Sequence, residues 1–523
     1  MVRVAEIKAP EARVSRKKAA GWHLFFSYTT VAYGIISGLV MVPLYLRFIP
    51  YELYGAWLAT GNILNWVLVV DPGLSTVIMQ RVGQSYGADR LNAVGAYALS
   101  GLLLTAIIVL GVILVGLIMA PHIAGWVNLL EADLARTLQI NFVLGLIAGG
   151  ITLFAFSVGV VNLGLQRSFA HGMVFLTANL LTLAVTIVLL FKGFGLYAIS
   201  LGLLTRALVF SLGGAGYMLC RLKREAIHLN FQRATMREML GLLSFTSLGK
   251  IGGLLSKNMD AFLIARFLGP DKVPIYILTR RGMEVAITML GRTGNAFSPS
   301  LSHLSGESDP GKMRFILNRL LYINLWILGL AFGGFLAFNE GFITVWVGQE
   351  LFAGSVVSTL FCLFMVLTLL FTLMQTLCVA LGDIKRNAIV QFVQALIIFS
   401  CMLFGTYFFG FVGAALAPII GYLSISLWYY PRSLTKRGHL QSNDLRRLTF
   451  ESVLCLGLGL LLALPFSQAS ITSWIGLILW ASAFLLLYSL VLMSLRPMLR
   501  KEVRLLKDTV LRKIIPQKPS LTS

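Results

Sequence analysis

The chain has 523 residues, of which 57% are apolar and only 12% are charged, and its mean hydropathy is +0.83. Soluble domains have about 45–50% apolar and about 25% charged residues, so the composition excludes a water-soluble enzyme or binding module. The net charge is +22, but most Lys and Arg residues lie in short stretches between apolar runs. That placement follows the positive-inside rule and requires no nucleic-acid partner.

The apolar runs are long enough to cross about 30 Å of hydrocarbon. Such runs must be helical in lipid, because no water is present to satisfy the backbone. We therefore predict an all-α polytopic membrane protein with about fourteen transmembrane helices and both termini in the cytoplasm. We expect breaks in the second and eighth runs, at Pro72-Gly73 and at Gly291. The predicted spans are residues 23–46, 53–80, 92–119, 138–162, 172–191, 195–218, 240–265, 274–302, 315–338, 353–380, 387–409, 411–431, 448–467 and 471–495.

Two stretches recur later in the chain at nearly the same offset. Residues 46–50 resemble residues 265–269, which lie 219 positions later, and residues 161–167 resemble residues 379–385 at an offset of 218. Related halves with an even number of spans share one orientation, with the symmetry axis along the membrane normal. We predict a six-helix bundle in residues 1–230, a second in residues 231–432, and two additional helices with a basic cytoplasmic tail in residues 433–523.

Six cations fall inside predicted spans rather than between them. A charge at the centre of the bilayer costs about 2.5–3.5 kcal/mol on insertion scales, so it is seldom found there without a polar cavity or a partner. Five of the six lie on the seventh and eighth spans. The six are Arg206, Lys250, Lys257, Arg280, Arg281 and Arg292.

Helical geometry groups these charges on narrow faces. At about 100° per residue, Arg280, Arg281, Glu284 and Arg292 fall within a sector of about 120° on the eighth span. The seventh span has a comparable polar face.

That face of the seventh span carries Lys250, Lys257 and Asp260. Two helices with one polar side each predict a water-filled cationic cavity, which favours an anionic ligand. Arginine binds phosphate oxygens in a bidentate manner, so these residues are the candidate substrate-binding set.

Two other interpretations of the same charges are open. Lys257 with Asp260 and Arg280 with Glu284 have the spacings of intrahelical ion pairs. Arg206 and other cations near span ends could instead extend their side chains to the lipid headgroups.

Asp71, in the second span, has two interpretations. An isolated acid at membrane depth is typical of a site for a coupling ion, here H⁺ or Na⁺. Alternatively, Asp71 caps the helix that begins after Pro72. We group Asp71, Asp260 and Glu284 as coupling or structural residues. The scattered cysteines and histidines indicate no metal site, and no cofactor is expected.

Several motifs resemble a known family. Residues 48–57 (FIPYELYGAW), followed by Asp71-Pro72-Gly73-Leu74, are similar to the start of the polysaccharide transporters that include the O-antigen (Wzx-type) flippases. Asp260 with Phe267-Leu268-Gly269, and Leu381-Gly382 with Lys385, resemble later parts of that family's pattern. The resemblance covers roughly residues 22–435. It implies two six-helix bundles forming a V, a fold shared with multidrug antiporters and lipid II flippases.

The resemblance also implies a substrate, a polyprenyl pyrophosphate that carries an oligosaccharide. The expected function is therefore a non-enzymatic flippase in the bacterial cytoplasmic membrane, with membrane lipids and a glycan polymerase or ligase as partners. Typical O-antigen flippases have twelve spans, whereas fourteen spans are closer to the number in lipid II flippases. A lipid II flippase is therefore an alternative function. An ion-coupled multidrug antiporter of the same fold is another, although a cationic cavity would repel its cationic substrates. A membrane glycosyltransferase, polymerase or ligase is disfavoured because no sizeable external loop is present.

Overall fold

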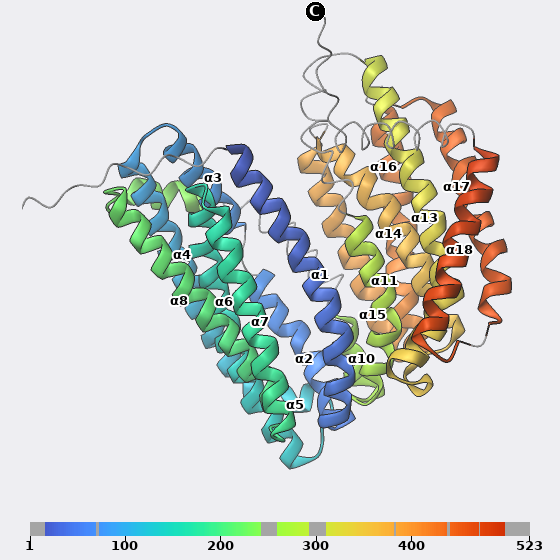
Figure 1. Cartoon of the computed structure of the whole chain (residues 1–523), viewed down its shortest axis with the longest axis horizontal. Coiled ribbons are helices and arrows are strands. Elements are labelled where there is room, and N and C mark those ends of the chain that lie inside the picture. Colours follow the sequence, from blue (N-terminus) through green and yellow to red (C-terminus); the bar gives the residue numbers. More distant parts are fainter. Residues whose placement is uncertain are drawn as a thin grey trace, which may run out of the picture. The chain divides into compact units, whose positions relative to one another are not determined.

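The computed structural model describes residues 16–69, 73–241, 259–291, 310–380, 383–436, 440–469 and 471–496, and these residues are helical with no strand among them. Figure 1 shows the helices in chain order. They are α1 (Arg16–Phe48), α2 (Tyr51–Val69), α3 (Leu74–Gly87), α4 (Leu91–Met119), α5 (Ile123–Trp126), α6 (Ala132–Gly164), α7 (Ser168–Phe191), α8 (Tyr197–Arg224), α10 (Asp260–Leu268), α11 (Lys272–Leu290), α13 (Pro310–Val347), α14 (Ser355–Ala380), α15 (Ile384–Gly421), α16 (Leu427–Lys436), α17 (Ser442–Ser467) and α18 (Trp474–Leu495).

Where the predicted spans fall on described residues, they correspond to these helices; most of the seventh span and the later part of the eighth lie outside the described residues. Ten helical segments of the described chain are long and apolar enough to cross a membrane. One of them, Arg386–Lys436, contains the eleventh and twelfth predicted spans, and its backbone bends at Gly410, where φ is 58°. The all-α membrane fold is therefore confirmed, and about fourteen crossings are compatible with it.

The described residues bear on each of the two predicted breaks on one side of an undescribed stretch. The second span consists of α2 and α3, and Gly73 precedes α3 with φ of 91°, in the left-handed region that favours glycine. Gly73 is the N-cap residue of α3, whereas Asp71, which was expected to bind an ion or to cap this helix, lies outside the described residues. Helix α11 ends at Leu290, directly before Gly291.

The chain divides into two compact units. The first contains residues 1–278 and 384–425, and the second contains residues 279–383 and 426–523. These units are defined by contacts between backbones. The division into bundles at residues 230 and 432 stays a prediction from the sequence repeat.

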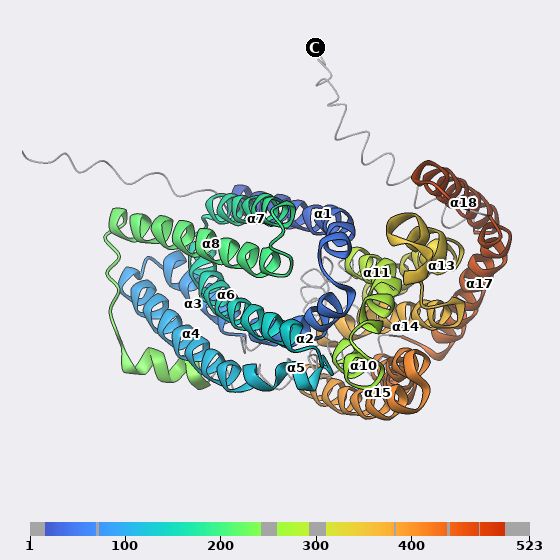
Figure 2. The ribbon, with the colours of Figure 1, turned by 90° about the horizontal axis from the view of Figure 1, so that it is seen from below.

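Helix α6 is at the centre of the first unit. It packs against α2, α3, α4 and α8, as Figure 2 shows. Apolar side chains such as Ile78, Val82 and Val161 fill the contacts at one end of these helices. Hydrogen bonds join helices as well, including the 2.8 Å bond between the hydroxyl groups of Thr105 and Ser157. The first unit is thus a bundle that uses both apolar packing and polar contacts between helices.

The seventh predicted span is described only at its two ends, in residues up to 241 and from 259 onward. Both ends pack within the first unit. At one end, Glu238 forms a 2.6 Å ion pair with Arg81 of α3 and accepts a 2.9 Å hydrogen bond from Tyr97 of α4, while Met239 is fully buried. At the other end, α10 packs against α2 and α15. The chain therefore enters and leaves this span in contact with the first unit.

A close approach joins the two sequence repeats within this unit. A Cβ atom on Gly55 of α2 would lie 1.8 Å from the carbonyl oxygen of Pro270 and 3.0 Å from Cδ of Pro274. Gly55 and Pro274 are separated by 219 positions, the offset of the first sequence echo. Corresponding corners of the two repeats thus pack directly on each other, and only glycine fits at position 55.

The echo at residues 161–167 and 379–385 has a structural counterpart too. In the first unit, Arg167 forms a 3.5 Å ion pair with Glu225, which follows the end of α8. In the second unit, Asp383 accepts 2.8 Å hydrogen bonds from the hydroxyl groups of Tyr429 and Ser433 on α16. In each unit, a carboxylate joins the loop after the fourth span to the end of the sixth span of the same repeat.

The two additional helices, α17 and α18, pack on α13 in the second unit. Arg314 of α13 binds Asp444 of α17 through two hydrogen bonds of 2.6 and 2.8 Å. Glu451 of α17 accepts 2.9 Å hydrogen bonds from Trp326 of α13 and from Arg496, which follows α18. These charge-assisted contacts fix the position of the helical pair on α13.

Small residues let α13 and α17 approach closely. A Cβ atom on Gly333 would lie 2.5 Å from the carbonyl oxygen of Gly459, and one on Gly329 would lie 2.6 Å from that of Cys455. Contacts of this kind are the main source of packing between helices in lipid, where apolar burial gives no preference for protein over lipid.

We predict that Gly333→Ala lowers the stability of the protein by about 1–3 kcal/mol, because the added methyl group separates α13 from α17. The matched control is Gly334→Ala, whose Cβ would meet only a ring atom of Phe484 at 3.7 Å. Since alanine favours helix over glycine by up to about 1 kcal/mol, the control should be neutral or stabilising. Thermal unfolding in detergent measures the difference, and equal midpoints would contradict the packing account.

Candidate functional site

Three of the six predicted substrate-binding cations are described by the structure: Arg206, Arg280 and Arg281. Lys250, Lys257 and Arg292 lie outside the described residues. The three arginines come from two regions, α8 in the first unit and α11 at the start of the second.

Arg206 lies deep along a membrane-spanning helix. It follows Tyr197, the first residue of α8, by nine residues, which corresponds to about 14 Å of helix. Gly202, one turn earlier, faces α7, since its Cβ would lie 2.0 Å from the hydroxyl oxygen of Thr186. Arg206, one turn after Gly202, therefore lies near the α7 side of α8.

The charge of Arg206 is not neutralised by a carboxylate in the described part of the chain. Its side chain is half-buried, and its Nε is buried without a hydrogen-bond partner. The guanidinium interacts electrostatically with the phenol of Tyr33 on α1. Tyr33 donates a 2.7 Å hydrogen bond to the backbone oxygen of Asn179 on α7. A cation in this position leaves capacity for an anionic ligand.

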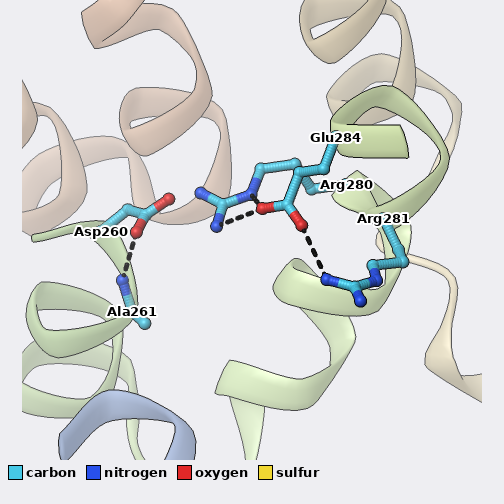
Figure 3. Close-up of polar contacts among 5 residues, drawn as sticks. All are labelled: Asp260, Ala261, Arg280, Arg281 and Glu284. Carbon is cyan, nitrogen blue, oxygen red and sulfur yellow. Dashed lines mark hydrogen bonds and ion pairs between the residues drawn. The ribbon is translucent and has the colours of Figure 1, made fainter. Parts of the chain in front are cut away.

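Helix α11 carries the second group of charges. One oxygen of Glu284 accepts from Nε of Arg280 and pairs with its Nη2, both at 2.9 Å. The other oxygen accepts from Nη1 of Arg281 at 3.2 Å. Figure 3 shows the carboxylate between the two guanidinium groups. The Arg280 side chain is 14% exposed, that of Glu284 32% and that of Arg281 38%.

The ionic group lies on the face of α11 that is turned away from α13. Gly282 is in contact with α13, because its Cβ would lie 3.3 Å from Asn339 and from Phe335. At about 100° per residue, Arg280 and Glu284 are about 160° from Gly282 around the helix. The charged side chains are therefore not part of the apolar contact between α11 and α13.

The ion pair between Arg280 and Glu284, an alternative interpretation of the sequence, exists. It also includes Arg281, for which the sequence indicated no partner. The assignment of both arginines to a substrate-binding site stays a prediction. One carboxylate between two guanidinium groups nevertheless leaves this group of three residues with one net positive charge.

Asp260 makes a local contact at the start of α10. It is the first residue of α10, its side chain is buried, and its Oδ1 accepts a 2.9 Å hydrogen bond from the backbone N–H of Ala261, as Figure 3 shows. An acid in the first turn is favoured by the helix dipole. The predicted pairing with Lys257 concerns a residue outside the described part of the chain.

Sequence reasoning missed the surroundings of Arg206. Tyr33 and Asn179 are isolated polar residues inside long apolar runs, and that isolation was the available signal. Their contact with each other depends on the packing of α1 against α7. Among the described residues, no group of three His, Cys, Asp or Glu side chains could hold a metal ion.

Comparison with known proteins identifies the family of this chain. A family model described as "Polysaccharide biosynthesis protein" matches residues 67–353, which is more than half of the chain. The chain belongs to this polysaccharide biosynthesis protein family. The matched region contains all six predicted cations and all of the described ionic group on α11. No curated protein sequence matches the chain.

The fold of this polysaccharide biosynthesis protein is similar to that of several solved membrane proteins. A lipid II flippase, MurJ, in an inward closed conformation has a TM-score of 0.67 at 14% identity, covering 90% of this chain and 98% of that one. An inward-facing multidrug resistance MATE family transporter of the MOP superfamily has a TM-score of 0.65 at 14% identity, covering 77% and 93%. A MOP superfamily transporter from Pyrococcus furiosus, described as having a binding pocket of reverse polarity, has a TM-score of 0.57 at 14% identity, covering 81% and 96%.

We predict that Arg206→Met raises the thermal stability of the protein, because it removes a charge that no described carboxylate compensates. Arg221→Met is the matched comparison on the same helix. Arg221 is 5% exposed and forms a 2.6 Å ion pair with Glu225, so its loss should cost about 3–5 kcal/mol. Unfolding midpoints of the two purified variants test this, and a comparable loss of stability in both would show that Arg206 supports the fold.

Proposed function

We propose that the protein is a flippase or exporter that moves a polyprenyl-pyrophosphate-linked oligosaccharide across the bacterial cytoplasmic membrane by alternating access. The observation that supports this most directly is Arg206, which lies on an apolar helix and contacts no carboxylate among the described residues. Arg280 and Arg281, which bind the same carboxylate of Glu284, add two further guanidinium groups. Membership of the polysaccharide biosynthesis protein family indicates a glycan as part of the substrate.

The chemistry of this substrate matches such a site. A pyrophosphate with several sugars cannot cross hydrocarbon unaided, whereas a polar cavity with arginine side chains can replace its hydration. The polyprenyl chain can remain in lipid. The cytoplasm is electrically negative, so outward movement of an anion is favoured by about 2.3 kcal/mol per charge per 100 mV. Coupling to H⁺ or Na⁺ is compatible with this scheme and would use Asp71 or another acid at membrane depth.

In this proposal each of the predicted cations contributes to binding of the anionic headgroup during the transport cycle. They are Arg206, Lys250 and Lys257 of the first unit and Arg280, Arg281 and Arg292 of the second. Asp260 serves the structure of α10. The excess of Lys and Arg in alternate loops supports cytoplasmic termini. Proteins that elongate or transfer the glycan outside the membrane would be its natural partners.

A lipid II flippase is the second candidate. It is favoured by the presence of α17 and α18 and by the similarity to MurJ over 98% of that chain. Its substrate also carries a polyprenyl pyrophosphate, so the same arginines would bind it. A multidrug antiporter of the same fold is disfavoured, because the described arginines would repel organic cations. Rescue of a strain that lacks its own lipid II flippase separates the first two candidates.

We predict that Arg206→Gln and the double variant Arg280→Gln/Arg281→Gln each lower export of the glycan at least about tenfold. Each variant loses charge-assisted hydrogen bonds to the pyrophosphate headgroup. Arg292→Ala and Lys257→Ala should act in the same direction. The control is Lys192→Gln, since Lys192 is exposed directly after α7. Translocation of a polyprenyl-pyrophosphate glycan in proteoliposomes is the measurement. Normal export by these variants at normal protein levels would show that the headgroup assignment is wrong.

A further inference from the structure

Glu284 has a geometry that goes beyond an ordinary intrahelical ion pair. Its carboxylate is divided between two cations, with one oxygen on Arg280 and the other on Arg281. Glu284 lies four residues after Arg280 and three residues after Arg281 on α11, so it can reach both arginines. The N–H groups that it occupies are the same groups that would bind phosphate oxygens. A carboxylate in this position and a bound phosphate therefore compete for the same donors.

We infer that Glu284 is an internal counter-anion, which binds Arg280 and Arg281 when the carrier is empty and is displaced when a pyrophosphate headgroup binds. The inference rests on the proposed function and specifies how the same site is filled and emptied. Two adjacent guanidinium groups repel each other and are costly at membrane depth without an anion. After release, the empty carrier must return from the outward-facing to the inward-facing conformation without its substrate. During that step Glu284 supplies the negative charge that the substrate provided.

The two arginines are not held equally. Arg280 makes two contacts of 2.9 Å and is 14% exposed, whereas Arg281 makes one contact of 3.2 Å and is 38% exposed. The contact of Arg281 is therefore the first to be exchanged for a phosphate oxygen, and that of Arg280 follows. On release, the reverse order restores the arrangement in Figure 3.

Competition by Glu284 lowers the affinity for the headgroup and thereby helps release. A transporter that binds its substrate too tightly does not turn over, because release becomes the slow step. Replacing Glu284 with glutamine keeps the size of the side chain and removes its charge. The variant should thus bind pyrophosphate more tightly and complete fewer cycles.

The test uses inorganic pyrophosphate and the full-length protein purified in detergent. Isothermal titration should show that Glu284→Gln binds pyrophosphate about tenfold more tightly than the wild type, while Glu284→Asp, which keeps the charge, stays close to the wild type. The control is Glu340→Gln on α13, because Glu340 is exposed and pairs with none of the described cations. In proteoliposomes, Glu284→Gln should show slower repeated turnover.

Weaker or unchanged pyrophosphate binding in Glu284→Gln would overturn the inference, since it would mean that Glu284 holds the arginines in position for the ligand. The double variant Arg280→Gln/Arg281→Gln tests the underlying site separately. If it binds pyrophosphate like the wild type, the headgroup assignment of the proposed function fails. If it loses binding while Glu284→Gln gains none, only the counter-anion role fails.

Discussion

The cost of holding guanidinium groups at membrane depth is the constraint on which the organisation of this protein depends. Water is absent from the hydrocarbon region, so each arginine there needs a carboxylate, a polar cavity or a ligand. The described arginines differ in how their charge is compensated. Arg167 and Arg221 both pair with Glu225 at the end of α8, and Arg280 and Arg281 both pair with Glu284 on α11. Arg206 contacts no carboxylate among the described residues.

The surrounding helices provide a rigid frame for these charges. Within the first unit, α10 is fixed against α2 by the close approach of Gly55 and Pro270. In the second unit, Arg314 with Asp444 and the contact of Gly333 with Gly459 hold α17 on α13. Such contacts have little tolerance for added volume, because the helices meet at their backbones. Each unit can thus keep its own geometry while it carries charged side chains on helix faces that are not part of that packing.

The family relationship and the site are consistent with each other. The proposed substrate carries a pyrophosphate, and arginine side chains bind phosphate oxygens in a bidentate manner. The similarity to MurJ and MATE proteins at 14% identity concerns the fold. Function is therefore argued from the described arginines and the family, and the fold explains how helices from both units can carry them.

The sequence by itself determined the properties that depend on one helix at a time. Hydropathy and length predicted the described spans, Gly73 and Gly291 marked the start of α3 and the end of α11, and the i,i+4 spacing indicated the pair of Arg280 with Glu284 as one alternative. Only the tertiary structure decided that Gly55 meets Pro270, that Gly333 meets Gly459, and that no described carboxylate reaches Arg206. The physical reason is that contacts between helices depend on the rotation and the axial shift of each helix. Those two quantities come from packing over the whole unit, whereas periodicity and spacing are properties of the local chain.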